Sequence, residues 1–171
     1  MGGLLRRPSS AFDPAAGLLR AEHFQVAYAT NDIDRARALL AERYGIERFQ
    51  RLEGPLAAGG RIRVELAWVG SVMYELMTAS GEGSAIYMDR LDDSDAFQIR
   101  HHHLGYLVAD AAQWRGLLNQ IEAKRHRMPH VGNSPGFMDS CFVEAPELGH
   151  YLEYIFPSPA GLAFLEAVPG N

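Results

Sequence analysis

The sequence predicts an α+β fold built from two tandem βαβββ modules, and three observations carry this prediction. Alternating apolar and polar residues recur along the chain, and the order strand, helix, three strands occurs twice. Each half places a histidine, His23 or His103, at the start of its first strand. Each half also places a glutamate, Glu75 or Glu153, in its last strand, and the two pairs are separated by nearly the same interval. Duplication of one unit explains these matches more simply than coincidence does.

The first module is expected over residues 21–80. From His23 to Tyr28, large apolar side chains alternate with smaller or polar ones, which predicts a strand ending near Thr30. Asn31 or Asp32 can then cap an amphipathic helix, and Gly45 is placed to end it. Three strands are predicted to follow, over 47–53, 61–69 and 72–78.

The second module, 101–157, repeats this order after a glycine-rich and acidic linker over 81–100. A strand is predicted over 103–109, then a helix capped by Asp110, then strands over 127–133, 137–144 and 150–156. Residues 21–157 would thus form a single domain. Residues 1–20 are expected to form an N-terminal arm, and residues 158–171 a C-terminal helix and tail packed on the outside.

Composition excludes several classes of protein. The chain has 171 residues, 47% of them hydrophobic, and a formal net charge of -5, so a globular core is expected and a nucleic-acid partner is not. No apolar run approaches the ~18 residues of a membrane span, and no secretory signal is recognisable. Cys141 is the only cysteine, and we interpret it as a small buried hydrophobe. The expected location is therefore the cytoplasm.

Two glutamates in apolar strands indicate either a buried ion pair or a metal site. Glu75 and Glu153 are expected to be covered on both faces, and a buried carboxylate needs a partner. Arg61 or Arg63 could supply one through an ion pair. A divalent cation is the favoured alternative, because neither glutamate has a lysine or arginine within its own strand. Imidazole and carboxylate together suit one ion of Zn, Ni, Co, Mn or Fe.

Three stretches resemble one known superfamily. They are His23-Phe24-Gln25-Val26-Ala27-Tyr28 with Asn31-Asp32-Ile33-Asp34, His102-His103-Leu104-Gly105-Tyr106-Leu107-Val108, and Pro146-Glu147-Leu148-Gly149-His150-Tyr151-Leu152-Glu153. Together with the paired modules, they resemble the vicinal oxygen chelate superfamily, which includes glyoxalase I, methylmalonyl-CoA epimerase, extradiol dioxygenases and bleomycin-resistance proteins. The last two stretches are most similar to the branch that contains methylmalonyl-CoA epimerase.

The resemblance implies an incomplete barrel cupped around one metal ion, with His23, Glu75, His103 and Glu153 as ligands. It implies a metal-dependent lyase or isomerase that removes a proton next to a metal-chelated carbonyl of a small substrate, with Glu75 or Glu153 as the base. Epimerases usually carry glutamine where this chain has Glu75, which makes the expected ligand set closer to that of glyoxalase I.

Two other functions stay open. Drug-binding relatives of the bleomycin-resistance type lack the ligands, and Fe(II) extradiol dioxygenases use two histidines and one carboxylate, so both fit four ligands less well. The chain is expected to act on a small molecule. The two modules could pair within one chain or, in a homodimer, by exchange between subunits, and the sequence leaves both arrangements open.

Further residues are assigned to the site by strand phase. The expected pocket residues are Gln25, Arg63, Met73, Gly105 and Tyr151, with core packing, or an outward position for Arg63, as the alternative. His102 is expected to support His103 or to point outward. His126, His130 and His150 have no matched partner and are expected at the surface or behind the ligands.

Overall fold

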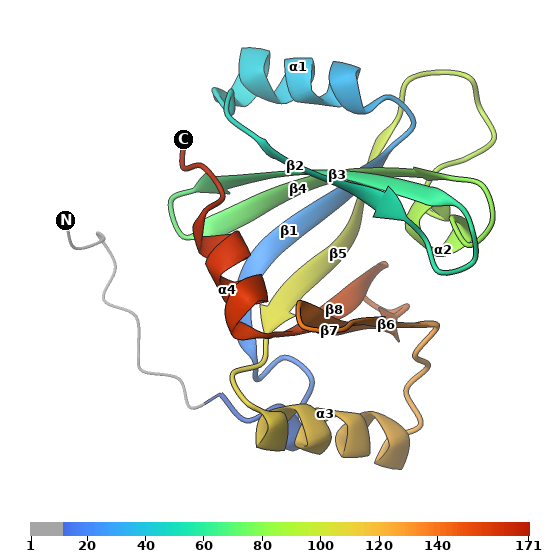
Figure 1. Cartoon of the computed structure of the whole chain (residues 1–171). Helices are drawn as coiled ribbons and strands as arrows, with labels where there is room; N and C mark the ends of the chain where they lie inside the picture. The colour runs from blue at the N-terminus through green and yellow to red at the C-terminus, as the bar shows by residue number, and fades with distance from the viewer. Residues whose placement is uncertain (1–11) are drawn as a thin grey trace.

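A computed structural model describes residues 12–171, and it confirms the two predicted modules within one eight-stranded sheet (Figure 1). The first module contains β1 (Glu22–Thr30), α1 (Ile33–Tyr44), β2 (Gln50–Pro55), β3 (Arg61–Val69) and β4 (Val72–Ser80). The second contains β5 (Ile99–Leu107), α3 (Ala111–Ala123), β6 (His130–Ser134), β7 (Met138–Ala145) and β8 (His150–Pro157). A 3-10 turn, η1 (Pro14–Ala16), precedes them, α2 (Ala85–Met88) lies in the linker, and α4 (Pro159–Glu166) follows.

The strand order β2-β3-β4-β1-β5-β8-β7-β6 places the first strands of the two modules at the centre of the sheet. Within each module the first strand pairs in parallel with the last, so Ala27 lies opposite Glu75 and Gly105 opposite Glu153. β1 and β5 pair antiparallel and join the modules. This topology brings the two glutamates, each predicted mid-strand, onto neighbouring parts of one curled surface.

Two irregularities interrupt the pairing of β1 with β5. The register shifts between His23 and Gln25 on β1, and again between Ala27 and Tyr28, where β5 carries the additional residue His102. An inserted residue reverses the phase of the side chains that follow it. As a result, the side chains on either side of each shift do not alternate as the sequence pattern predicts.

α1 and α3 cover the outer face of the curled sheet (Figure 1), and its inner face surrounds a cavity, the cup. α1 packs Ile33, Ala36 and Leu40 on the first module, and α3 packs Leu117 and Ile121 on the second. Asp32 caps α1 through its side chain, which accepts from the backbone N–H of Arg35, and Gly45 ends that helix in the left-handed region at φ 71°.

The C-terminal helix corrects one expectation. The predicted C-terminal helix is present as α4 and is capped by Ser158, but it does not pack on the outside of the molecule. Its Leu165 is buried among inner-face residues such as Phe24 and Met77. The helix thus forms part of the wall of the cup, because its apolar side faces the apolar inner surface of the sheet.

The ends of the chain and the linker also differ from expectation. The predicted arm lies partly outside the described residues; within them, η1 packs against α3. β5 begins at Ile99, inside the predicted linker, and β6 begins at His130 rather than 127. No helix in residues 12–171 is long and apolar enough to cross a membrane.

Candidate metal centre

The centre of the cup brings together one imidazole and two carboxylates. His103 Nε2 lies 3.0 Å from Glu153 Oε2 and 3.9 Å from Glu75 Oε2. One ligand atom from each residue lies within 4.8 Å of the other two. His103 is fully buried and Glu75 nearly so, while Glu153 is slightly more exposed. Three of the four predicted metal ligands therefore converge on one point.

No arginine or lysine forms an ion pair with either glutamate within the part of the chain that the structure describes. Arg63 lies on the outer face of β3, where it donates to Glu65 at 2.7 Å and to Asp34 at 2.7 Å. Its expected place in the substrate pocket is wrong. Side chains alternate across a strand, and Ile62 and Val64 take the inner positions. The ion-pair alternative for the glutamates is removed with it.

His23 is the expected ligand that the structure does not place in the cup. It is exposed, its ring packs 5.4 Å from that of Tyr106 on the outer face, and its Nε2 lies 3.0 Å from the Gln25 carbonyl oxygen. The register shift after His23 reverses the side-chain phase, so Phe24 and Gln25 both face inward. The correction is therefore a consequence of the bulge.

Gln25 occupies the position that His23 was expected to fill. Its Nε2 donates to Glu75 Oε2 at 2.6 Å, and its side chain is buried. Its Oε1 is also buried and has no hydrogen-bond partner among residues 12–171. Gly105, opposite in β5, leaves room for it, because a Cβ there would lie 2.4 Å from this oxygen. The Gln25 amide therefore binds Glu75 through its nitrogen, while its oxygen has no hydrogen-bond partner in the described chain.

His102 orients the His103 ring. His102 is buried, and its Nε2 lies 2.8 Å from the Ile86 carbonyl oxygen, which can only accept, so Nε2 carries the proton. Burial, together with the nearby charge of His103, lowers the pKa of His102 to about 3, which leaves its Nδ1 unprotonated. That atom accepts from His103 Nδ1 at 2.9 Å. The His103 Nε2 is thereby directed at the carboxylates.

Burial and mutual repulsion perturb the ionisation of this cluster, in which, among the residues described, His103 is the one positive partner of two carboxylates. Burial raises the pKa of Glu75 to about 7; the charge of His103 opposes this shift and that of Glu153 adds to it. Burial lowers the pKa of His103, but the Glu153 and Glu75 carboxylates outweigh burial and raise it. His103 Nε2 is 3.0 Å from Glu153 but is not aligned for a hydrogen bond, so it too has no hydrogen-bond partner in the described chain.

The donor set fits a divalent metal ion. Gln25 Oε1 and His103 Nε2 are buried polar atoms without partners in residues 12–171, and buried polar atoms are normally satisfied. Two carboxylates, an amide oxygen and an imidazole nitrogen are ligands that first-row transition metals accept.

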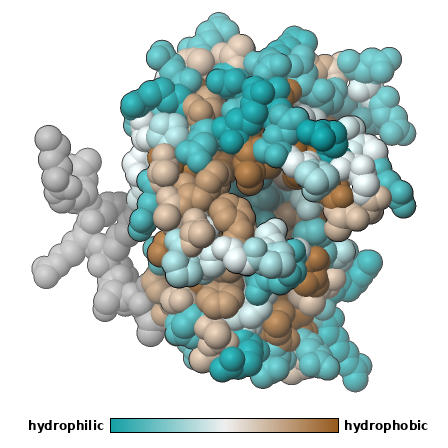
Figure 2. Space-filling view, in the orientation of Figure 1, coloured by the Kyte–Doolittle hydropathy of each residue, from teal (hydrophilic) through white to brown (hydrophobic). Residues whose placement is uncertain are grey.

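The cavity over this cluster is small and mostly apolar, with a volume of about 170 Å³. Figure 2 shows hydrophobic side chains gathered around a hollow between the two halves of the molecule. Besides Gln25, Glu75, His103 and Glu153, its lining consists of Leu52, Ile62, Val64, Leu66, Met77, Tyr87, Met138, Phe142, Ile155, Phe164 and Leu165.

The other expected pocket residues lie beside the cavity rather than along it. Met73 is fully buried, with its sulfur 3.8 Å from Gln25 Nε2. Tyr151 stacks on Phe142 and donates its hydroxyl to Asp89, and the Arg90 guanidinium lies 4.4 Å from the centre of its ring. Gly105 provides the space for Gln25 described above.

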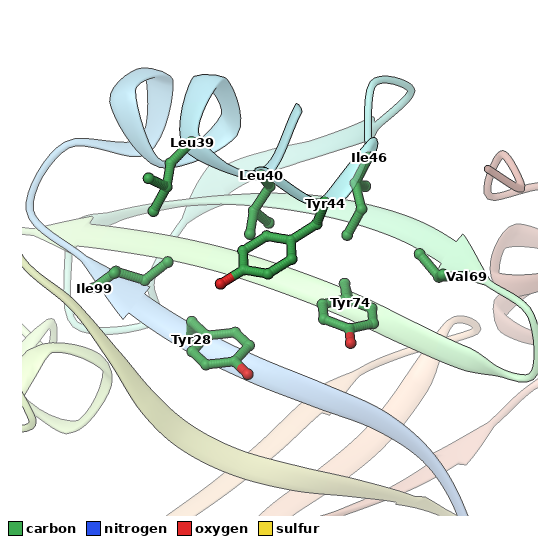
Figure 3. Close-up of a pocket in the computed structure, with 8 residues that line it drawn as sticks. All are labelled: Tyr28, Leu39, Leu40, Tyr44, Ile46, Val69, Tyr74 and Ile99. Atoms are coloured by element: carbon green, nitrogen blue, oxygen red, sulfur yellow. The ribbon is translucent and has the colours of Figure 1, made fainter. Parts of the chain in front are cut away.

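A larger cavity of about 480 Å³ lies on the opposite face of the sheet, beneath α1 (Figure 3). Its lining is aliphatic and phenolic: Tyr28, Leu39, Leu40, Tyr44, Ile46, Val69, Tyr74 and Ile99. This lining contains no carboxylate and no imidazole, so it lacks the groups needed for acid, base or metal chemistry at neutral pH. The carboxylates and the imidazole that could carry such chemistry line the smaller cup.

Sequence reasoning missed three contributors to the site. Gln25 was assigned to the pocket and not to the ligand group, although the interval that relates Glu75 to Glu153 also relates Gln25 to His103. The linker supplies Ile86 and Tyr87, for which no periodicity gave a signal. The expectation that His102 supports His103 agrees with its contacts, although metal binding itself remains a prediction.

Comparison with known proteins gives the fold. The sequence matches no family model and no curated protein. Among solved structures, it is similar to methylmalonyl-CoA epimerase from Mycobacterium tuberculosis, with a TM-score of 0.59 and 16% identity over 83% of this chain and 91% of that one. It is also similar to Streptomyces coelicolor methylmalonyl-CoA epimerase variants in complex with 2-nitronate-propionyl-CoA. For one of these the TM-score is 0.58 and the identity 18%, over 82% and 96% of the two chains.

These matches cover more than four fifths of this chain and agree with the paired βαβββ topology described above. The chain has the vicinal oxygen chelate fold.

Proposed function

We propose that this chain is a metal-dependent lyase or isomerase that removes a proton from the carbon next to a carbonyl of a small substrate. The observation that carries the proposal is the buried group of two carboxylates, one imidazole and one amide, with two polar atoms unpartnered in the described chain. The similar solved structures are epimerases, which supports an isomerase but not a particular substrate.

Gln25, Glu75, His103 and Glu153 would hold the ion. A bound divalent cation would supply Lewis-acid stabilisation of the negative charge that develops on a substrate oxygen. Two carboxylates would balance its charge and would no longer repel each other. The His102 contact keeps His103 oriented, and Gly105 keeps Gln25 in place.

Glu153 is the better candidate for the base. The amide of Gln25 fixes Glu75 at 2.6 Å, whereas the partner of Glu153 is His103 Nε2 at 3.0 Å, an atom that a bound metal ion would take up. Glu153 is therefore freer to reach a substrate C–H and to carry the proton on its Oε2. Because a carboxyl group can return this proton to a neighbouring atom, Glu153 alone can serve an isomerisation. An epimerisation needs a proton delivered to the opposite face of the same carbon, for which Glu75 is the second carboxyl group in the cup.

The lining favours an uncharged reacting group. No lysine or arginine lines the cup, so nothing in the described wall would pair with a substrate carboxylate or phosphate. Methylmalonyl-CoA carries a carboxylate at the reacting carbon, so the cup fits a glyoxalase-like hemithioacetal or a neutral 2-oxo compound better. The volume of about 170 Å³ admits only the small reacting end of such a molecule.

A binding protein is the competing proposal, favoured by the largely apolar wall of the cup. Metal analysis separates the two functions. Protein purified without a histidine tag or chelator should contain about one transition metal per chain, and this metal should be absent from His103→Ala and Glu153→Ala. The matched control is His126→Ala, because His126 is exposed and does not line the cup.

Activity then tests the reaction. The metal-loaded protein should turn over hemithioacetals, and Glu153→Gln should abolish turnover while leaving the fold intact. Wild-type protein that is purified without metal, and that also takes up no Zn²⁺, Ni²⁺ or Co²⁺ on reconstitution, would contradict the proposal and leave the binding protein.

A further inference from the structure

Tyr87 is the one residue of the described cup lining that carries a polar side chain and does not belong to the proposed metal-binding group. The remaining lining residues are aliphatic side chains, methionines and phenylalanines. If an ion engages Gln25, Glu75, His103 and Glu153, the Tyr87 hydroxyl is the side-chain group left in this wall to recognise a substrate oxygen.

A histidine outside the lining holds this hydroxyl. His130 Nε2 lies 3.2 Å from the Tyr87 oxygen, and the two rings meet edge to face at 5.5 Å. Both rings also contact Phe142, which lies in the cup wall. Tyr87 comes from the linker helix α2, and His130 comes from the edge strand β6, so the pair joins the linker to the second module.

The protonation states suit a hydrogen-bond donor. Burial, with smaller effects of Glu153 and Glu75, raises the pKa of Tyr87 to about 12, so the phenol keeps its proton. Burial lowers the pKa of His130, with a smaller opposing effect of Glu153, so the imidazole is neutral near pH 7. A neutral imidazole can accept from the phenol in the empty cup and, as the other tautomer, donate to it when a substrate accepts the phenol proton.

We propose that Tyr87 is a substrate-binding residue whose hydroxyl donates a hydrogen bond to a substrate oxygen in the cup, and that His130 is its positioning residue. The ligand class is a small, uncharged molecule with one oxygen for the metal ion and a second oxygen, on a neighbouring atom, for Tyr87. This inference rests on the proposed function for the identity of the site, but the contact between Tyr87 and an oxygen ligand can be tested without turnover.

The test uses acetohydroxamate, a small probe whose two oxygens are carried by neighbouring carbon and nitrogen atoms. Its affinity is measured from the visible spectrum of Co²⁺-loaded wild-type protein and of Tyr87→Phe, His130→Ala and His130→Gln. Tyr87→Phe keeps the ring and removes the hydroxyl. Tyr44→Phe is the matched control, because Tyr44 lies in the cavity on the opposite face.

Tyr87→Phe should bind the probe about 5- to 10-fold more weakly, which corresponds to one hydrogen bond, with Co²⁺ affinity unchanged. His130→Ala should show a similar loss, and His130→Gln should recover most of it, because an amide can both donate and accept. A purely structural role would not produce this recovery. Wild-type probe affinity in Tyr87→Phe would overturn the proposal.

Nuclear magnetic resonance separates this proposal from the proposed function. If wild-type protein takes up no Co²⁺, the metal-dependent function fails, and Tyr87 is judged on the metal-free protein. There the ¹³Cζ signal of Tyr87, assigned by its loss in Tyr87→Phe, should shift on addition of millimolar acetohydroxamate. A Tyr87 ¹³Cζ signal that stays unshifted up to the highest acetohydroxamate concentration that dissolves would overturn the inference.

Discussion

Gly105→Ala tests the geometry of the centre without altering a proposed ligand. Gly105 lies on β5 opposite Gln25. An added Cβ would lie 2.4 Å from Gln25 Oε1 and 2.8 Å from Gln25 Cβ. The oxygen could move with its flexible side chain, but the Gln25 Cβ is fixed to the backbone of β1. Relief of the clash therefore requires the central strand pair to shift as well.

The expected cost has two parts. Overpacking of a tight interior costs about 1–3 kcal/mol. If the amide swings away, the hydrogen bond to Glu75, which has a charged acceptor, is also lost, at about 1.5–3 kcal/mol. In a domain of this size about 1 kcal/mol corresponds to about 2–4 °C in melting temperature, so we expect a fall of about 5–24 °C when both costs apply. Co²⁺ affinity should fall by about tenfold or more, because the Gln25 oxygen, a proposed metal ligand, leaves the site.

Calorimetry and a Co²⁺ titration of the folded variant measure both effects. Gly54→Ala is the control, since Gly54 also lies in a strand and a Cβ there would have no neighbour within 4 Å. We expect that control to stay within about 0.5 kcal/mol of wild type. Gly105→Ala with wild-type melting temperature and wild-type Co²⁺ affinity would refute the placement of Gln25 beside Glu75.

Three further changes follow from the same geometry. His23→Ala should leave Co²⁺ binding unchanged, whereas Gln25→Ala should weaken it by about tenfold or more; the reverse pattern in a Co²⁺ titration would restore His23 as the ligand. His102→Phe removes the acceptor of the His103 Nδ1 proton and should weaken Co²⁺ binding by about 10- to 100-fold, so unchanged affinity would show that the ring needs no such support. Burial raises the pKa of Cys141 to about 12, so its thiolate becomes abundant only at higher pH. Its alkylation by iodoacetamide at pH 8 should therefore be about a thousandfold slower in the folded protein than in denaturant, and equal rates would contradict its burial.

The sequence predicted most of the fold because the duplication is visible in residue types. Glu75, His103 and Glu153 were matched between the halves, and the structure brings them together. His23 was matched to His103 by residue type, although the interval between them is longer than the interval from Glu75 to Glu153. The shorter interval, counted back from His103, leads to Gln25, so this mismatch was present in the sequence. The register shift that turns His23 outward was not, because a bulge depends on how two strands pair.

Arg63 shows a second kind of limit. Residues 61–66 alternate basic or acidic side chains with Ile62, Val64 and Leu66, which predicts that Arg63 and Glu65 share one face. The pattern does not say which face forms the cup. The structure buries Glu65 on the outer face, where Arg51 and Arg63 both donate to its Oε1 at 2.9 Å or less. The apolar alternate residues line the cup instead.

The chemistry of the site arises where the two halves differ. At equivalent positions the first module has Gln25 and Ala27, and the second has His103 and Gly105. The smaller residue in the second module gives Gln25 its space. The linker, which has no counterpart in the repeat, adds the Ile86 carbonyl behind His102 and the Tyr87 hydroxyl in the cup wall. A symmetric duplication would place two identical pairs around the centre. Here divergence provides one imidazole, one amide and a polar contact from the linker, which is the asymmetry that a site needs to bind a substrate in a single orientation.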